Sequence, residues 1–215
     1  MYLIEKISRY IGSNISSILN LDNDKKEVIV YGAFIFIQTI WSIFLIILFG
    51  LIFNVLLESI IISFSAAFLR KYSGGAHATS PNRCAFIGVI IFNGFAVIIS
   101  KITINPIFAL IYGILSFLFT YYIIYKYAPV DTPSKPIKKE ETKKRLKKKS
   151  IVILHILVLA SMILAVLYLN LEDKKILNNI ICICIGITWQ SVTLTNLGHI
   201  LTSKLDLTLS KLHIK

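Results

Sequence analysis

A short polar segment, RKYSGGAHATSPNRC (residues 70–84), places a histidine and a cysteine seven residues apart, next to a glycine pair. A cysteine nucleophile needs a nearby base that can later return a proton to a leaving amine, and histidine suits both steps near neutral pH. Glycine also allows backbone N–H groups to turn toward a developing oxyanion. We therefore take Cys84 as the candidate nucleophile, His77 as its base, and Gly74 and Gly75 as supports of an oxyanion.

The end of this segment predicts the start of a helix. Ser80 is a favoured N-cap residue and Pro81 a favoured first helical residue, so Cys84 would lie in the first turn. Unpaired amides and the positive end of the helix dipole favour a thiolate at that position. The side chains of Arg83 and Arg70 would add to this effect.

Each of these residues also has an unreactive interpretation. A single cysteine at the edge of an apolar segment is usually packed, a single histidine usually lies on the surface, and Gly-Gly is common in turns. The residue that would orient the base is left open among Ser73, Ser80, Asn82 and Glu58. We expect His155 to be structural, and His199 and His213 to be solvated on the tail.

The elements that position this segment are predicted to be membrane-spanning helices. The chain has 215 residues, is 56% hydrophobic and has a mean hydropathy of +0.76. Its apolar residues come in long blocks, and about 20 of them suffice to cross a bilayer. The sequence therefore predicts an all-α polytopic membrane protein with about six transmembrane helices, at 28–50, 52–69, 84–100, 106–125, 151–170 and 176–195.

The first 27 residues predict a different kind of element. They lack the continuous apolar core of a signal peptide, and their apolar residues recur at helical spacing with polar residues between them. We expect an amphipathic helix that lies on the membrane surface, or one that packs on the rest of the protein. Residues 28–195 would form the membrane domain and 196–215 a tail.

The distribution of basic residues predicts the orientation. Twenty of the 23 Lys and Arg residues lie in segments 1–27, 70–83, 126–150 and 196–215, which the six spans place on one side. The positive-inside rule assigns that side, with both termini, to the cytoplasm. The net charge of +12 is thus first a sign of topology. Nucleic-acid binding is not predicted, because no soluble basic domain is present.

The basic run in 126–150 is denser than orientation requires. It includes six cationic residues that could bind anionic lipid as a solvated loop, or dock an acidic peptide partner: Lys143, Lys144, Arg145, Lys147, Lys148 and Lys149. Two other cysteines, Cys182 and Cys184, are two residues apart, so their side chains would point in different directions on a helix. Without CxxC spacing, neither a disulfide, a metal site nor a cofactor is predicted.

Two motifs resemble those of the accessory gene regulator B (AgrB) family of quorum-sensing peptide processors in Gram-positive bacteria. The first is Arg70 with SGGAH, which ends at His77, and Cys84. The second is YAPVDTPSKPIKK (residues 127–139), which is similar to the family's AP-D-T-x-x-KP loop. The length, the six predicted spans and the amphipathic start agree with the resemblance along nearly the whole chain.

The resemblance implies a cysteine endopeptidase of the bacterial cell membrane. Such an enzyme removes the acidic C-terminal tail from an AgrD-like precursor peptide with an amphipathic leader, and leaves a thiolactone or lactone ring. Cys84 would be the nucleophile and His77 the base and acid, with Arg70 and Gly75 in support; a homodimer is favoured. Two alternatives remain open from the residues alone: a transporter of a small peptide or ion, and a non-enzymatic scaffold that recruits an acidic partner.

Overall fold

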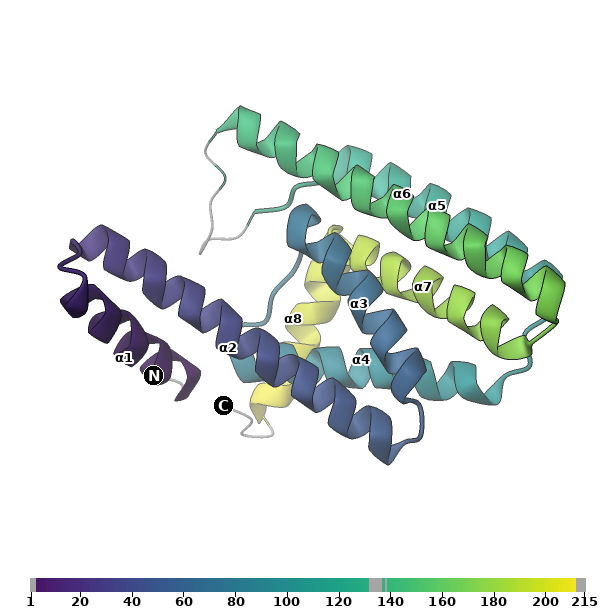
Figure 1. Cartoon of the computed structure of the whole chain (residues 1–215), viewed down its shortest axis with the longest axis horizontal. Coiled ribbons are helices and arrows are strands. Elements are labelled where there is room, and N and C mark those ends of the chain that lie inside the picture. Colours follow the sequence, from purple (N-terminus) through teal and green to yellow (C-terminus); the bar gives the residue numbers. More distant parts are fainter. Residues whose placement is uncertain (1–2, 132–136, 138, 212–215) are drawn as a thin grey trace.

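The fold consists of helices joined by short connections, as seen in a computed structural model that describes residues 3–131, 137 and 139–211 (Figure 1). In chain order the helices are α1 (Leu3–Ile18), α2 (Asn23–Ile52), α3 (Leu56–Ser73), α4 (Pro81–Lys101), α5 (Pro106–Tyr127), α6 (Glu140–Leu171), α7 (Lys174–Val192) and α8 (Asn196–Lys211). The described residues form no strand, only a single bridge between Gly74 and Val130.

Five helices are long and apolar enough to cross a bilayer: α2, α4, α5, α6 and α7. They correspond to five of the six predicted spans and confirm an all-α polytopic membrane protein. The predicted span 52–69 corresponds to α3, which does not meet the same criteria. Its 18 residues include Glu58, Arg70 and Lys71, so its apolar stretch is short, and it packs against α2, α4, α6 and α7.

Helix α7 lies at the centre of the bundle, between α3 and α4 on one side and α5 and α6 on the other (Figure 1). Its buried residues surround the helix rather than forming one stripe, which is typical of a helix enclosed by neighbours. Ile181 packs with Ile62 of α3, Ala96 of α4 and Ala109 of α5 in one hydrophobic cluster. The central helix therefore holds the surrounding helices in register.

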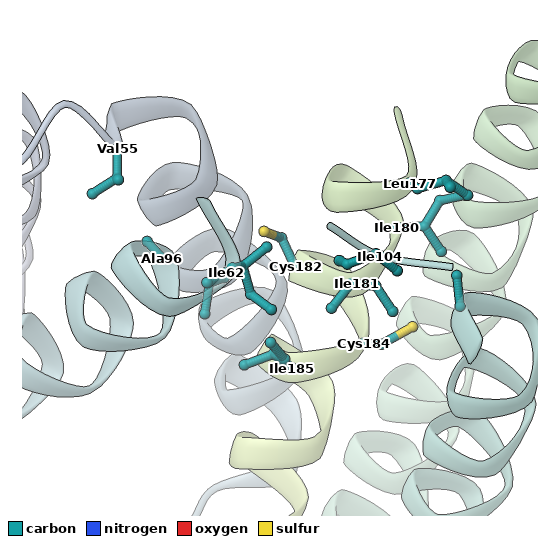
Figure 2. Packing of buried hydrophobic residues seen from close by; sticks show 12 residues of the cluster. Val55, Ile62, Ala96, Ile104, Leu177, Ile180, Ile181, Cys182, Cys184 and Ile185 are labelled. Carbon is teal, nitrogen blue, oxygen red and sulfur yellow. The ribbon is translucent and has the colours of Figure 1, made fainter. Parts of the chain in front are cut away.

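Cys182 and Cys184 belong to this cluster and are fully buried free thiols. Their sulfur atoms point in different directions from α7 (Figure 2), as the two-residue spacing predicts. Cys84 is the third cysteine, and it is partly exposed at the start of α4.

The connections lie at opposite ends of the bundle. The short turns after α2, α4 and α6 lie at one end, and the polar segments 74–80, 128–131 and 193–195 lie at the other (Figure 1). At this second end the Val130 N–H donates to the Ser73 carbonyl at 2.8 Å, and the Ala76 N–H donates to the Thr193 carbonyl at 3.0 Å. The predicted grouping of the polar segments on one side therefore agrees with the contacts.

The N-terminal segment forms the predicted helix, α1, and it packs along the first half of α2. The face in contact is a stripe of mostly small residues: Ile4, Ser8, Gly12 and Ser16. A Cβ on Gly12 would lie 2.3 Å from Val30 Cγ2, so only glycine allows this approach. Most of the larger apolar side chains of α1, such as Leu3 and Tyr10, remain exposed and are free to contact lipid.

Two segments are more helical than the sequence predicts. Residues 140–150, expected as part of a polar connection, form the first turns of α6 and continue directly into its apolar part. Lys, Glu and Arg are good helix formers, so the helix extends beyond the apolar block. The tail also contains a helix, α8, which packs against α4.

Candidate catalytic site

The end of α3 and the loop that follows it are held by Arg70. Its guanidinium donates hydrogen bonds to the Ala76 carbonyl and, at 3.4 Å, to Gln190 Oε1 on α7. The Ala76 carbonyl directly precedes His77, so Arg70 fixes the backbone from which the histidine extends. Arg70 is thus a structural support of the loop as well as a partly buried positive charge.

Gly74 and Gly75 allow this loop to lie against two other segments. Gly74 has a φ of +73° and Gly75 a φ of +133°, values that favour glycine. A Cβ on Gly74 would lie 1.9 Å from the Val130 carbonyl oxygen, and one on Gly75 would lie 2.6 Å from Thr193 Oγ1. The Gly74 N–H donates to the Arg70 carbonyl at 3.0 Å. Support of an oxyanion by this pair stays a prediction, and the close approach is sufficient reason for two glycines.

Gln190 is the polar centre of this arrangement. It is 1% exposed and lies near the end of the apolar helix α7. Its Nε2 donates to Ser73 Oγ at 3.1 Å and to the Gly74 carbonyl at 2.7 Å, while its Oε1 accepts from Arg70. An amide buried among apolar residues costs free energy unless it is hydrogen-bonded. Gln190 therefore fastens the end of α3 to α7.

The helix start predicted at Ser80 and Pro81 is confirmed. Ser80 is the N-cap of α4, Pro81 is its first residue, and the Cys84 N–H makes the first hydrogen bond of the helix, to the Ser80 carbonyl at 2.9 Å. The Ser80 hydroxyl makes no capping hydrogen bond, and it is buried. Cys84 therefore lies one turn from the helix start, as expected, but without a side-chain cap from the same helix.

The two arginines near Cys84 have different surroundings. Partial burial of Arg70 lowers the pKa of its guanidinium, while the negative charge of a Cys84 thiolate acts in the opposite direction. The two groups are therefore within electrostatic range. Arg83, by contrast, forms an ion pair of 2.6 Å with Asp206 on α8. Its charge is largely balanced there, so Arg70 is the better candidate to stabilise a thiolate.

His77 lies in the loop between Gly75 and Ser80. Partial burial lowers the pKa of its imidazole to about 4, and the positive charges of Arg70 and His199 act in the same direction. The outer surface of the side chain is exposed, and water there weakens these effects without reversing them. His77 is thus neutral at physiological pH and able to accept a proton.

Arg70 is the group that links the proposed pair, because it interacts electrostatically with both Cys84 and His77. Within the described part of the chain, the side chains of Cys84 and His77 do not hydrogen-bond to each other. Such bonds in substrate-free enzymes often tighten only when substrate binds. Glu58, one candidate for an orienting residue, lies 12 residues before Arg70 on α3, about 18 Å away along the helix.

The six basic residues predicted for substrate docking lie on the first turns of α6. Lys143, Lys144 and Lys147 line a pocket of about 350 Å³ together with Ala128, Pro129, Asp131 and Glu140. Lys143 pairs with Glu140 at 2.9 Å, and Lys147 donates to the Tyr125 carbonyl at 2.5 Å. Because Val130 also bridges to Gly74, this pocket adjoins the loop that carries His77. Arg145, Lys148 and Lys149 lie on the same turns outside the pocket.

Two residues of α8 approach the candidate site, which the sequence did not predict. His199 is exposed, as expected, and it is close enough to His77 to affect the pKa of its imidazole. Asp206 is 6% exposed and binds both Thr79 and Arg83. Burial alone would raise the pKa of Asp206, but hydrogen bonds from Thr79 and Arg83 outweigh it and hold that pKa below its usual value. The sequence offered one signal: Gly198, Thr202 and Asp206 are spaced four residues apart, which places them on one face if the tail is helical.

Within the described residues, no three His, Cys, Asp or Glu side chains gather as a metal-ligand set. Cys84, His77 and Arg70 contribute a thiol, an imidazole and a guanidinium. A thiol with a neighbouring base is a combination that can perform acyl transfer.

Comparison with known proteins places the chain among accessory gene regulator proteins. A model of the family described as accessory gene regulator B matches residues 4–194, a region that ends just before α8. An AgrB-like protein of Clostridium perfringens strain SM101 is 44% identical over 213 residues, which cover 98% of this chain and 100% of that protein. A second, from C. perfringens strain 13, is 42% identical with the same coverage.

A more distant relative is the accessory gene regulator protein B of Staphylococcus intermedius. It is 34% identical over 109 residues, which cover 51% of this chain and 55% of that protein. No solved structure matches the chain.

The exposure of the three thiols generates a first prediction. N-ethylmaleimide added to the protein in native membranes should modify Cys84 and spare Cys182 and Cys184, because the latter two are fully buried in α7. Peptide mass spectrometry before and after unfolding measures the modified fraction at each position. Cys84→Ala should remove native labelling, and comparable native labelling of Cys182 or Cys184 would contradict the packing of α7.

The surroundings of His77 generate a second prediction. Diethyl pyrocarbonate modifies neutral imidazole, so its reaction with His77 should persist at about pH 5, where a histidine of ordinary pKa is mostly protonated. Arg70→Gln removes a neighbouring cation and should raise the pH at which His77 modification is half-maximal, whereas Arg70→Lys keeps the cation and should change it less. Modification is measured by peptide mass spectrometry across pH. An ordinary midpoint in the wild type, or equal midpoints for Arg70→Gln and Arg70→Lys, would count against this electrostatic link.

Proposed function

Since the chain belongs to the accessory gene regulator B family, we propose that it is an integral-membrane cysteine endopeptidase. It removes the C-terminal tail of a small autoinducing-peptide precursor and promotes closure of a thiolactone or lactone ring for quorum sensing. One observation carries the proposal: the sole unburied thiol, Cys84, lies at a helix start within electrostatic range of Arg70, which also interacts with His77. The membrane helices support a location in the bacterial cell membrane, with the site on the cytoplasmic side.

The first step forms an acyl-enzyme. Neutral His77 accepts the proton of the Cys84 thiol, and the sulfur attacks the carbonyl carbon at the junction between ring segment and tail. The protonated imidazole then donates this proton to the nitrogen of the leaving amine. The peptide bond breaks, the acidic tail leaves with a free amino group, and a thioester joins Cys84 to the rest of the precursor.

The second step closes the ring. A thiol or hydroxyl within the precursor loses its proton to His77 and attacks the thioester carbonyl. The carbon–sulfur bond to Cys84 breaks, and the Cys84 thiolate regains a proton from His77. Exchange of one thioester for another is nearly balanced in energy, so the internal nucleophile must be held close while water is kept away.

The location of the site suits this requirement. Cys84 lies in the first turn of a membrane helix, and the loop before it packs against Thr193, Val130 and α8. An amphipathic leader of the precursor would bind the same membrane surface. Its ring segment would thus reach Cys84 from the interface, where the bound precursor itself would cover the exposed side of the loop.

The pocket at the start of α6 is the proposed place for the acidic tail. It adjoins the loop that carries His77 through the bridge from Val130 to Gly74. Lys143, Lys144 and Lys147 supply positive charge toward carboxylates of the tail. This docking contributes to binding of the precursor and not to the chemical step.

A third prediction concerns the covalent intermediate. The purified protein in liposomes, mixed with a synthetic precursor peptide, should form a thioester between Cys84 and the ring-containing part of the precursor. Intact-protein mass spectrometry detects the added mass, and a hydroxylamine pulse should remove it. Cys84→Ala should abolish both adduct and tail release, while His77→Ala should slow tail release by at least about 100-fold, at the lower end of the usual range for general acid–base catalysis.

The control for this experiment is Cys182→Ala together with Cys184→Ala, which removes thiols outside the site. This variant should form the adduct at the wild-type rate if it remains folded. Tail release that continues at the wild-type rate in Cys84→Ala would exclude the proposed mechanism.

A fourth prediction concerns docking. Replacement of Lys143, Lys144 and Lys147 by Gln should raise KM for the precursor several-fold with little change in kcat, because charge attraction is lost but the catalytic groups remain. The difference from wild type should shrink as salt is raised, since ions screen exposed charges. The matched control is Lys174→Gln with Lys175→Gln, at the opposite end of the bundle. Equal effects of the two variants would argue against a specific docking pocket.

A further inference from the structure

One buried carboxylate, Asp206 of α8, connects the two chain segments that carry the proposed catalytic pair. Its Oδ2 accepts hydrogen bonds from the Thr79 N–H at 3.2 Å and from Thr79 Oγ1 at 2.7 Å, and its Oδ1 accepts from Arg83 Nε at 2.6 Å. Arg83 also donates to Thr79 Oγ1. Thr79 lies two residues after His77, and Arg83 directly precedes Cys84.

These contacts hold the start of α4, which has no side-chain cap from Ser80. The N-cap residue Ser80 gives no side-chain hydrogen bond to the helix start. Asp206 instead binds one residue on each side of the Ser80–Pro81 junction and brings a negative charge to the N-terminal end of the helix. A carboxylate there is favourable because of the helix dipole. The start of α4, and with it Cys84, is therefore fixed from α8.

Asp206 is kept in place by the face on which it lies. The buried residues of α8 are Gly198, Thr202, Asp206 and Leu209, which form one stripe. A Cβ on Gly198 would lie 2.0 Å from the Val192 carbonyl oxygen, so the beginning of α8 is locked against the end of α7. The carboxylate is thus presented by a helix anchored to the core and not by a mobile tail.

The charge of Asp206 favours a role in positioning the site rather than in activating the Cys84 thiol. A negative charge near Cys84 disfavours its thiolate, and the pairing with Arg83 balances a cation that would have favoured it. If Asp206 acted on the thiol only by charge, it would hinder the reaction. Its benefit must come from the geometry that its three hydrogen bonds impose.

We propose that Asp206 is a positioning residue for acyl transfer: it fixes the loop of His77 and the first turn of Cys84 relative to each other. This role rests on the function proposed above. It implies that α8 is part of the catalytic unit and that the site is incomplete without the segment after residue 195. A misplacement of about 1 Å is enough to cost on the order of 100-fold in rate.

The experiment compares Asp206→Ala, Asp206→Asn and the control Lys204→Ala, an exposed residue of the same helix, as full-length protein in liposomes. With a synthetic precursor, Asp206→Ala should lower kcat about 10- to 100-fold and change KM less than about twofold. Asp206→Asn keeps an oxygen that can accept a hydrogen bond from Thr79, so its kcat should fall less than that of Asp206→Ala. Lys204→Ala should match the wild type.

A second readout needs no precursor. The rate of Cys84 alkylation is measured in the wild type, His77→Ala, Asp206→Ala and the double variant. If Asp206 holds the two residues together, His77→Ala should slow alkylation in the wild type and have little further effect in Asp206→Ala. An equal effect of His77→Ala in both backgrounds would overturn the proposal, as would wild-type kcat in Asp206→Ala.

Folding is checked for each variant by size-exclusion chromatography and thermal unfolding in detergent. If Asp206→Ala does not fold, Thr79→Val and Arg83→Ala remove its partners singly, and the same loss of kcat and of coupling to His77 is expected. If folded Thr79→Val and Arg83→Ala both keep the wild-type kcat and the wild-type effect of His77→Ala on alkylation, the proposal is overturned. Precursor processing that survives Cys84→Ala would refute the proposed function instead, whereas the alkylation readout would still test the role of Asp206.

Discussion

The need to satisfy polar groups at the edge of the hydrocarbon layer is the constraint on which the site depends. Gln190 is fully buried and Arg70 partly buried, and an unpaired polar group away from water costs several kcal/mol by general estimates. The chain satisfies them with each other, with Ser73 and with carbonyls of the loop. This network forces the segment after α3 to fold back over α7. The loop geometry is therefore a result of desolvation as much as of catalysis.

The hydrogen bonds of Arg70 and Gln190 bring the loop after α3 close to two other segments of the chain. Two glycines let the loop touch Val130 and Thr193 without steric conflict. The loop then has only a few residues in which to reach Pro81, so Cys84 enters the first turn of α4 within electrostatic range of Arg70. The site is consequently assembled from segments far apart in the sequence, with α3, α4, α7 and α8 each contributing one side.

Features encoded locally could be predicted from the sequence, and features that depend on distant contacts could not. The membrane helices follow from apolar blocks of sufficient length, and the start of α4 follows from Ser80 and Pro81. Glu58, Arg70 and Lys71 in α3 show why one predicted span differs from the others, since they shorten its apolar stretch. The roles of Gln190 and Asp206 depend on hydrogen bonds to residues that lie 116 to 127 positions earlier in the sequence. Neither spacing nor composition contains that information.

The continuity of α6 has a mechanical consequence. Its first turns project beyond the apolar part for about 16 Å, given 1.5 Å per residue over Glu140–Ser150. Because α6 has no break between these turns and its apolar part, a change in the tilt of the apolar part also moves the first turns. A change in bilayer thickness that alters the tilt of α6 by about 10° would displace its far end by about 3 Å. Such a change in tilt would also alter the distance between the basic pocket at the start of α6 and Cys84 at the start of α4.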